Sequence, residues 1–344
     1  MELLKKVSEE ELEKIERNYW KTQLKRMLKD WRLYVMLIPL VFVFFCWKYL
    51  PLQGLLIGFK NFTQSAGIGD SQFVGLHWFE KLMFGDASVQ FWRAFKNTFV
   101  ISFYGLVFGF PFPIILALLF SEIKSDVYRS VVQIFCYLPK FVSIVVITTI
   151  TICILRPSTD FNEAGPLAQL MYSLNIVPEF INNNGVNEPN SILKNPEYFR
   201  ALYQITGIWE TGGYSSIVYF AAIIGISPTS YEAARIDGAN KMAQIKYVTF
   251  PSIASTLTIM LIMQIGHLLT VGYEKVLLLT NNGQSPNASA GEVITAYVYR
   301  IAMTGAKANP SMGSAADLFN AIIAMLLVLG SNAIARRVSS TSLY

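Results

Sequence analysis

Six long apolar stretches constrain the fold of this chain more than any other feature of its sequence. About 20 mostly apolar residues in helical form are needed to cross the roughly 30 Å hydrocarbon core of a bilayer. Six segments have this character: residues 33–50, 97–120, 131–155, 201–226, 253–280 and 315–335. Because a lipid-facing backbone must satisfy its own polar groups, each segment is expected to be an α-helix. The sequence therefore predicts an all-α polytopic membrane protein with six transmembrane helices.

The composition fits a surface that faces lipid rather than water. Charged residues make up 15% of the 344 residues, whereas about 25% is usual for a soluble domain. The mean hydropathy is +0.41. The 24 Phe, 17 Tyr and 6 Trp can supply aromatic belts at both membrane interfaces. Such a composition excludes an ordinary soluble globular protein.

Proline occurs in three of the expected spans. Pro39 lies in the first, Pro111 and Pro113 in the second, and Pro139 in the third. Proline removes one backbone hydrogen bond from a helix, and in membrane proteins neighbouring groups satisfy the freed carbonyl. We therefore expect kinks at these positions.

The distribution of Lys and Arg predicts that both termini are cytoplasmic. With the N-terminus inside, the inner segments carry 16 cations in about 76 residues, and the outer loops carry 9 in about 125 residues. Positive charge accumulates on the cytoplasmic side of membrane proteins, so this roughly threefold difference in density sets the orientation. No cleavable signal peptide is evident, because the first apolar stretch is as long as a span and follows a long charged segment.

The chain divides into three parts by charge and apolarity. Residues 1–32 form a basic segment whose apolar residues recur near the helical period, so an amphipathic N-terminal helix is expected there. Such a helix either lies on the anionic inner leaflet or serves only as a topology signal. Residues 33–337 form the six-span domain, with a cytoplasmic loop at 227–251, and residues 338–344 form a cytoplasmic tail.

The cytoplasmic loop before the fifth span has the residues of a compact turn between two short helices. Thr229 and Glu232 have the spacing of a capping box, which predicts the start of a helix. Gly238 allows a sharp bend, and a second helix is expected from about residue 240 to 247. Pro251 is expected to set the entry to the next span.

This loop resembles the EAA signature of the permease subunits of type I ATP-binding-cassette importers. The matching run is Glu232-Ala233-Ala234, three residues, Gly238, nine residues, and Val248-Thr249-Phe250-Pro251. Val248 and Phe250 replace the Ile and Leu that are usual in the family, and apolar character is kept. The resemblance implies that the loop is a coupling helix that docks into a groove on an ATPase subunit. The residues that carry this implied role are Glu232, Ala233, Ala234, Asp237, Gly238 and Pro251.

The resemblance extends over nearly the whole chain and is strongest to carbohydrate permeases of the maltose and oligosaccharide type. Residues 73–79 and 95–98 look like the loop before the second span of those permeases. Residues 48–60, together with the long charged N-terminal segment, look most like the subgroup that handles oligosaccharides or polysaccharide fragments. The implied fold is the six-helix fold of type I importer permeases.

The resemblance also implies partners. It implies a second permease subunit, two ATPase subunits forming a homodimer or heterodimer, and an extracytoplasmic binding protein that delivers a sugar at a bacterial cell membrane. ATP and Mg²⁺ would be bound by the ATPase subunits, since this chain has no Gly-x-x-x-x-Gly-Lys loop. Two histidines and three cysteines without metal-ligand spacing indicate no metal site. We therefore expect no enzymatic activity, cofactor or nucleic-acid partner for this chain.

Polar residues inside the spans are candidates for the substrate path, because they are costly in lipid and usually face a cavity or each other. The candidates are Lys140, Glu210, Tyr214, Gln264 and His267, with Glu274 and Lys275 as weaker ones. In related maltose permeases, the tyrosine at the place of Tyr214 contacts sugar, whereas uncharged residues stand at the places of Lys140 and Glu210. This difference suggests a ligand other than maltose.

Each of these candidates also has a structural interpretation. Lys140 and Glu210 can form an ion pair between spans, and His267 can make an interhelical hydrogen bond. Lys275 can extend its ammonium group outward to the membrane interface. The glycines of Trp209-Glu-Thr-Gly-Gly-Tyr214 can let the backbone approach a ligand.

Two alternative functions remain open from the sequence. The first is an ATP-dependent permease for a solute other than a sugar, since those families carry similar loops. The second is a self-sufficient secondary transporter, which would often show inverted repeats with paired broken helices. No such repeat is visible in this sequence.

Overall fold

The computed structural model describes residues 19, 23, 29–156, 164–176, 179–181, 187–189, 192–304 and 308–338. Contacts divide the chain into two compact units, Met1–Leu56 and Ile57–Tyr344. Most of the amphipathic helix expected within residues 1–32 lies outside the described residues. The same holds for the tail expected at 338–344, except Val338.

The first unit contains one long apolar helical segment. Helix α2 runs from Trp31 to Phe44 and continues through Pro39 without a break. It passes into the π-helical turn η1 (Phe45–Tyr49) and then into the 3₁₀ helix η2 (Leu50–Phe59). These 29 residues are long and apolar enough to cross a membrane, and none of the α2 side chains is buried. The expected span at 33–50 lies within this segment.

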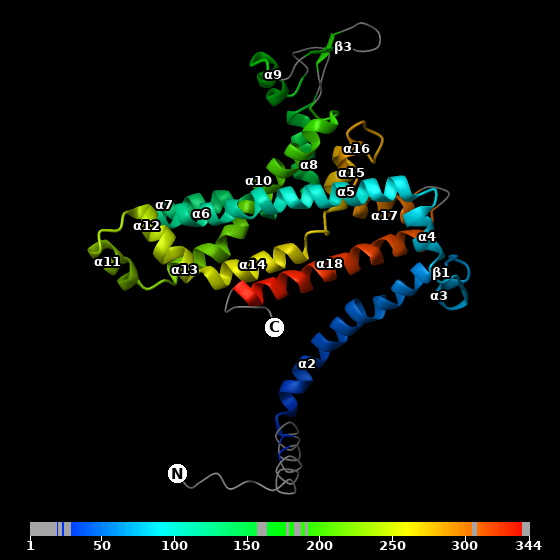
Figure 1. Cartoon of the computed structure of the whole chain (residues 1–344), viewed down its shortest axis with the longest axis horizontal. Helices are drawn as coiled ribbons and strands as arrows, with labels where there is room; N and C mark the ends of the chain where they lie inside the picture. The colour runs from blue at the N-terminus through cyan, green and yellow to red at the C-terminus, as the bar shows by residue number, and fades with distance from the viewer. Residues whose placement is uncertain are drawn as a thin grey trace. The chain divides into compact units, whose positions relative to one another are not determined.

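The described part of the second unit is mostly helical (Figure 1). Its α-helices are α3 (Gly67–Asp70), α4 (His77–Phe84), α5 (Ser88–Tyr104), α6 (Pro111–Glu122), α7 (Asp126–Tyr137), α8 (Ile144–Ile154), α9 (Pro166–Ser173), α10 (Pro196–Ile224), α11 (Pro228–Ile236), α12 (Lys241–Gln244), α13 (Phe250–Ser252), α14 (Ala254–Gly266), α15 (Tyr273–Leu279), α16 (Ala288–Gly291), α17 (Ile294–Met303) and α18 (Pro310–Val338). Its 3₁₀ and π turns are η3 (Gly105–Gly109), η4 (Leu138–Phe141) and η6 (Ile245–Thr249). Two short antiparallel strand pairs join β1 (Lys60–Asn61) to β2 (Gln72–Phe73) and β3 (Glu179–Ile181) to β4 (Asn187–Pro189).

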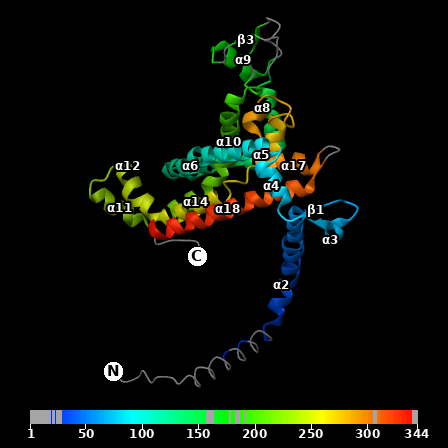
Figure 2. The ribbon, with the colours of Figure 1, turned by 45° about the vertical axis from the view of Figure 1, so that its right-hand side comes forward.

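The second and sixth spans agree with expectation. Helices α5 and α6 are joined by the π-helical turn η3 into a candidate span of 35 residues, Ser88–Glu122. Pro111 stands at the first turn of α6, where its missing N–H costs nothing. The extra residue in η3 absorbs the proline, since the Phe110 amide donates to the Gly105 carbonyl at 3.1 Å. Helix α18 supplies the sixth span, and it lies beside α14 (Figure 2).

The third span is broken where the sequence predicts only a kink. Pro139 lies in the 3₁₀ turn η4, and α8 begins after it, with Ser143 as its N-cap. The axes of the two halves differ by 97°. The Ser143 hydroxyl accepts from the Val145 amide at 3.4 Å and starts a new helix instead of continuing the old one. The prediction of one span over residues 131–155 is therefore wrong in shape.

The fifth span is also broken, against the prediction of one helix over residues 253–280. Helix α14 ends at Gly266, and α15 begins only after Gly272. The carbonyls freed between them are partly satisfied from neighbouring helices. Asn320 donates to the Leu269 carbonyl at 3.1 Å, and Thr295 donates to the Val271 carbonyl. Such partners allow irregular backbone within a membrane protein.

The fourth span, α10, is unbroken for 29 residues and packs against α6, α7 and η4. Its contact with α7 is very close at Gly213, where an added Cβ would lie 1.9 Å from the Cys136 carbonyl oxygen. An added Cβ at Gly212 would lie 2.7 Å from the Phe112 ring. These glycines allow close packing of helices, so the expectation that they let backbone approach a ligand is wrong.

Candidate functional site

The loop at residues 227–251 folds as the helix–bend–helix that its sequence predicts. Between α11 and α12, Gly238 has a φ of 78°, which glycine adopts without steric cost. The Gly238 amide donates to the Arg235 carbonyl at 3.0 Å, and the Ala239 amide donates to the Ala234 carbonyl at 2.9 Å. These two hydrogen bonds close the C-terminal end of α11 and fix the bend.

The start of α11 differs from the prediction. The helix begins at Pro228, and its N-cap Ser227 makes no side-chain capping hydrogen bond. The Thr229 hydroxyl pairs with the Ser227 hydroxyl at 2.7 Å. Proline at the first helical position already has the required φ, so the helix begins two residues earlier than a Thr229 cap would allow. The expected capping box of Thr229 with Glu232 is therefore wrong.

Side-chain contacts hold this loop together and attach it to α6. The Asn240 side chain caps α12. The Tyr231 and Thr249 hydroxyls pair at 3.0 Å across the loop. The Lys241 ammonium group lies 2.6 Å from the Glu122 carboxylate at the end of α6. The loop is therefore tied to the cytoplasmic end of the second span under the predicted topology.

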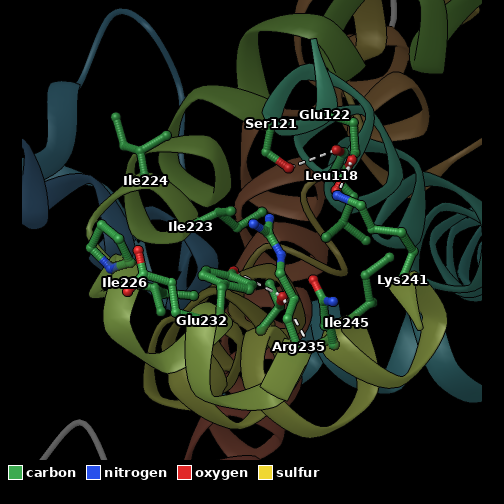
Figure 3. Close-up of a pocket in the computed structure, with 14 residues that line it drawn as sticks. Leu118, Ser121, Glu122, Ile223, Ile224, Ile226, Glu232, Arg235, Lys241 and Ile245 are labelled. Carbon is green, nitrogen blue, oxygen red and sulfur yellow. Dashed lines mark hydrogen bonds and ion pairs between the residues drawn. The ribbon is translucent and has the colours of Figure 1, made fainter. Parts of the chain in front are cut away.

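A pocket of about 360 Å³ lies between the loop and the ends of α6 and α10 (Figure 3). Arg235 occupies its centre, and the Lys241–Glu122 ion pair closes one side. Its other lining residues include Leu118, Ile223, Glu232 and Gln244. The loop thus leaves a cavity between itself and the ends of α6 and α10, and many of its other side chains are exposed.

The predicted coupling residues lie mostly on the outside of the loop. Glu232 and Ala233 are exposed on α11, whereas Ala234 is half-buried. Asp237 and Gly238 are exposed at the bend. Pro251 lies in α13, and the chain bends by 68° between the helices on either side of Ile253. That bend agrees with the predicted role of Pro251 at the entry to the next span.

Three exposed apolar side chains on this loop were missed in the sequence. Ile236 is 87% exposed, Met242 74% and Tyr247 69%. Contiguous apolar patches outside the lipid-facing spans mark surfaces that bind other proteins, and these three side chains are candidates for such a patch. The signal was present as apolar residues in a polar loop, but burial inside the loop was an equally good interpretation before the structure was known.

The candidate substrate residues Glu210 and Tyr214 lie on one side of α10. Arg200, Tyr203, Gly207, Glu210 and Tyr214 follow one another at spacings of three or four residues, which places them in one stripe. We call these five positions the α10 stripe. In its middle part Glu210 is buried and Tyr203 and Gly207 are half-buried, and Tyr214 at its inner end is exposed.

A buried charge meets the middle of the α10 stripe. The Lys275 side chain is only 2% exposed, and its ammonium group donates to the Tyr203 carbonyl at 3.2 Å. The same group lies 4.7 Å from the centre of the Tyr203 ring and interacts electrostatically with the buried Glu210. The expectation that Lys275 extends outward is therefore wrong, because α15 begins only at Tyr273 and turns this side chain toward α10.

Lys140 lies near the inner part of the stripe but forms no ion pair there. Its neighbour Phe141 packs edge-on against Tyr214, with ring centres 5.9 Å apart. The Lys140 side chain itself is exposed. Within the part of the chain that the structure describes, no ion pair joins Lys140 to Glu210. The suggested pair is therefore not seen, and Glu210 interacts with Lys275 instead.

The remaining candidates are not brought to the stripe by any contact. Gln264 and His267 are exposed at the end of α14, and Glu274 is exposed on α15. Among the residues with described positions, none of these three side chains makes a hydrogen bond. The expected interhelical bond of His267 is absent there. A role of these three residues in the substrate path stays a prediction.

The comparisons with known proteins agree with this arrangement. Residues 109–341 match the family described as binding-protein-dependent transport system inner membrane component. The chain is similar to protein LplB of Bacillus subtilis (strain 168), with 33% identity and 94% of each chain covered. It is also similar to the polygalacturonan/rhamnogalacturonan transport system permease protein YteP of the same organism, with 32% identity and 94% of each chain covered.

Solved structures show the same fold. A bacterial ABC transporter involved in the import of the acidic polysaccharide alginate contains a chain with a TM-score of 0.78 and 35% identity. The match covers 93% of this chain and all of that one. A second structure of a bacterial alginate ABC transporter, in complex with an alginate pentasaccharide-bound periplasmic protein, has a TM-score of 0.77.

The matched family is one of transport permeases and not of enzymes. The chain belongs to the family of binding-protein-dependent transport system inner membrane components. This membership confirms the resemblance given by the EAA-like run. It also excludes the alternative that the chain is a self-sufficient secondary transporter.

Proposed function

We propose that this chain is one of two membrane-spanning permease subunits of an ATP-driven importer for an oligosaccharide or polysaccharide fragment. Family membership supports the permease role. The names of the similar proteins, which concern polygalacturonan, rhamnogalacturonan and alginate, support a sugar polymer as the substrate. An ATP-dependent permease for another solute is the alternative that the experiments below distinguish.

The observation that carries this proposal is the loop at residues 227–251. It presents Ile236, Met242 and Tyr247 to solvent, and it is tied to α6 by the Lys241–Glu122 pair. Exposed apolar side chains on a compact support are the usual anchors of protein interfaces. We infer that this face docks on an ATPase subunit, with Ile236 as the central anchor beside Ala233 and Gly238.

The expected partners are a second permease, two ATPase subunits and an extracytoplasmic binding protein. ATP and Mg²⁺ would be held by the ATPase subunits, and this chain would bind no cofactor. Closure of the ATPase pair on ATP would move the docked loop, and the loop would move the ends of α6 and α10 that it contacts. Such a rigid motion between two states is the general form of alternating access in transporters.

We infer that both termini are cytoplasmic and that the loop at 227–251 lies on the cytoplasmic side. The distribution of Lys and Arg supports this orientation. The segment that holds α9, β3 and β4 then lies outside, where a binding protein would meet the permease. Labelling of single cysteines introduced at Ser230 and at Ser173 in intact cells tests this topology, since only the second should react with an impermeant reagent.

Docking of the loop is tested with the substitution Ile236→Asp in the co-expressed complex. A charge at the centre of an apolar contact is expected to weaken ATPase binding by at least about 30-fold, as for an interface hot spot. Ser230→Asp, also exposed on α11, serves as the matched control and should leave the complex intact. Co-purification of the ATPase subunits at wild-type yield with Ile236→Asp would contradict the docking assignment.

The substrate class is tested by ATP-dependent uptake in vesicles that contain the whole importer. Uptake of neutral or acidic glycan pentamers supports the sugar proposal. Uptake of only amino acids, phosphate or other small solutes would contradict the sugar proposal and would still support an ATP-dependent permease.

A further inference from the structure

A pocket of about 500 Å³ lies beside the start of α10, away from the loop described above. It is lined by residues of α5, η3 and α10, among them Tyr104, Phe108, Glu197, Arg200, Gln204 and Ile205. Arg200 is also the first member of the α10 stripe. The pocket therefore adjoins the candidate substrate path at its outer end, under the proposed topology.

The charge of Arg200 is not neutralised inside the chain. Its Nη2 atom lies 3.5 Å from the Asn97 side-chain oxygen, and its buried Nε atom has no hydrogen-bond partner. Among the described residues, no carboxylate lies within ion-pair distance of this guanidinium group. The Glu292 backbone carbonyl accepts a hydrogen bond from the Asn97 side chain, and the Glu292 carboxylate is paired with Arg300. A half-buried cation at the end of a span is costly unless an anion completes its environment.

The polar groups of the pocket are held in place by bonds to the backbone. The Asn97 amide nitrogen donates to the Ser289 and Glu292 carbonyls at 3.0 and 3.1 Å, which leaves its oxygen facing Arg200. The Gln204 amide nitrogen donates to the Ile101 carbonyl, which leaves the Gln204 oxygen as a hydrogen-bond acceptor. The pocket thus offers one cation from Arg200, one carboxylate from Glu197 and one fixed acceptor from Gln204.

Two aromatic rings form the other wall. Tyr104 and Phe108 have ring centres 6.2 Å apart, inclined at 49°, and both rings are exposed. Ligand sites are commonly built from such apolar walls with a few polar groups that fix orientation. A flat ligand with an apolar face and polar edges fits this arrangement.

We propose that Arg200, Gln204 and Tyr104 form a subsite for a carboxylate-bearing sugar unit, such as a uronic acid. The guanidinium group would bind the sugar carboxylate, Gln204 and Glu197 would accept hydrogen bonds from its hydroxyls, and the rings would cover its apolar face. The phosphate of a lipid headgroup has the same charge chemistry toward Arg200, and the test below separates the two sources. This inference rests on the proposed sugar importer and adds the acidic character of the substrate.

The position of the subsite suits an entry point. Arg200 lies in the second turn of α10, just after the segment that is outside in the proposed topology. Tyr214 lies 14 residues further along the same stripe, which is about 21 Å at the rise of an α-helix. The subsite and Tyr214 therefore lie toward opposite ends of one helix, with the buried Glu210 and Lys275 between them.

The test uses the complete importer in vesicles and two matched probes. These are a pentamer of galacturonic acid or of alginate, and the same pentamer with its carboxyl groups methyl-esterified. Arg200→Gln should raise the KM for the charged pentamer by about tenfold, the value of one charge-assisted hydrogen bond. The KM for the ester should change little. Arg93→Gln, an exposed cation on α5 outside the pocket, is the matched control and should behave as wild type.

Several outcomes would overturn the inference. Equal effects of Arg200→Gln on both probes, or no effect on either, would remove the carboxylate role. An effect that appears only with anionic lipid in the vesicles would assign Arg200 to a lipid headgroup. If the Arg200→Gln chain fails to assemble, Arg200→Lys is used instead, because it keeps the charge. Arg200→Lys should raise the KM for the charged pentamer by less than tenfold and leave the KM for the ester unchanged. A ratio of these two KM values equal to that of the wild type would count against the subsite.

The two proposals fail in different ways. Uptake of neutral glycans with no uptake of either acidic pentamer would overturn the acidic subsite and keep the sugar importer. An assembled complex that hydrolyses ATP and imports no glycan would overturn the sugar importer itself.

Discussion

The loop at residues 227–251 and the α10 stripe are built in opposite ways. The loop takes its shape from contacts within about 20 residues, such as the Gly238 and Ala239 amides on the end of α11. The stripe is completed by side chains far away in the sequence, because Lys275 meets Tyr203 and Phe141 meets Tyr214. A locally determined part can move as a rigid unit, whereas a part assembled from several helices changes when those helices shift. This contrast is what a coupled transporter requires of its two ends.

The stripe is most sensitive at its helix contacts. Gly213→Leu would place a side chain where even a Cβ meets the Cys136 carbonyl at 1.9 Å, so α7 and α10 would have to separate. Overpacking of this kind costs roughly 1–3 kcal/mol or more. We expect loss of most of the folded chain, measured by size-exclusion chromatography and thermal unfolding in detergent. Gly225→Ala, with 3.4 Å of space to the Ala221 carbonyl, is the control.

The loop is most sensitive at its bend. Gly238→Val would force a β-branched residue into a left-handed conformation at a cost of at least about 1–2 kcal/mol. The resulting shift of α12 against α11 should lower sugar uptake per ATP hydrolysed by about tenfold.

A second substitution separates backbone strain from loss of space at the bend. Gly238→Asn should keep more coupling than Gly238→Val, because asparagine tolerates φ above zero. Among the described residues, apart from its two chain neighbours, no atom lies within 4 Å of the new Cβ. Normal coupling in the valine variant would show that the bend is only a connector.

Tyr214 tests whether the stripe contacts sugar. Tyr214→Ala should raise the KM for uptake several-fold to tenfold, since aromatic contacts contribute roughly 0.5–1.5 kcal/mol beyond their buried area. Tyr214→Phe should retain most of the affinity. Trp209→Ala removes an exposed aromatic ring from another face of the same helix, and its KM should not change. If both alanine variants lose affinity alike, the effect belongs to helix packing and not to the stripe.

The smallest effect is expected at the Lys241–Glu122 pair. Both side chains are at least half exposed, at 61% and 50%, and exposed ion pairs contribute roughly 0.2–1 kcal/mol. A double-substitution cycle of Lys241→Gln and Glu122→Gln should show a coupling of less than about fivefold in uptake rate. A much larger coupling would mean that this pair, and not packing alone, connects the loop to α6.

The same contrast explains what the sequence predicted. Four of the six apolar stretches and the bend at Gly238 depend on local pattern, and the structure reproduces them as continuous helical segments and a left-handed glycine. The break after Gly266 depends on partners such as Asn320, which lies 51 residues from the carbonyl it satisfies. The contact of Lys275 with Tyr203 was missed for the same reason, since nothing near Lys275 in the sequence shows that its side chain meets α10. Arg200 was overlooked because it stands outside the apolar stretch and its partner Asn97 is 103 residues away.

The interrupted fifth span has a further consequence for leakage. Helix α14 has 13 residues and covers about 20 Å, so the backbone becomes irregular before the segment has crossed a 30 Å hydrocarbon layer. Thr270 and Gly272 are exposed in this stretch, and irregular backbone at such depth is not found against lipid. This side of the chain must therefore be sealed by a neighbouring subunit or wetted by the transport cavity. If the proposed second permease covers this side, the barrier to ions is formed only when the two subunits assemble.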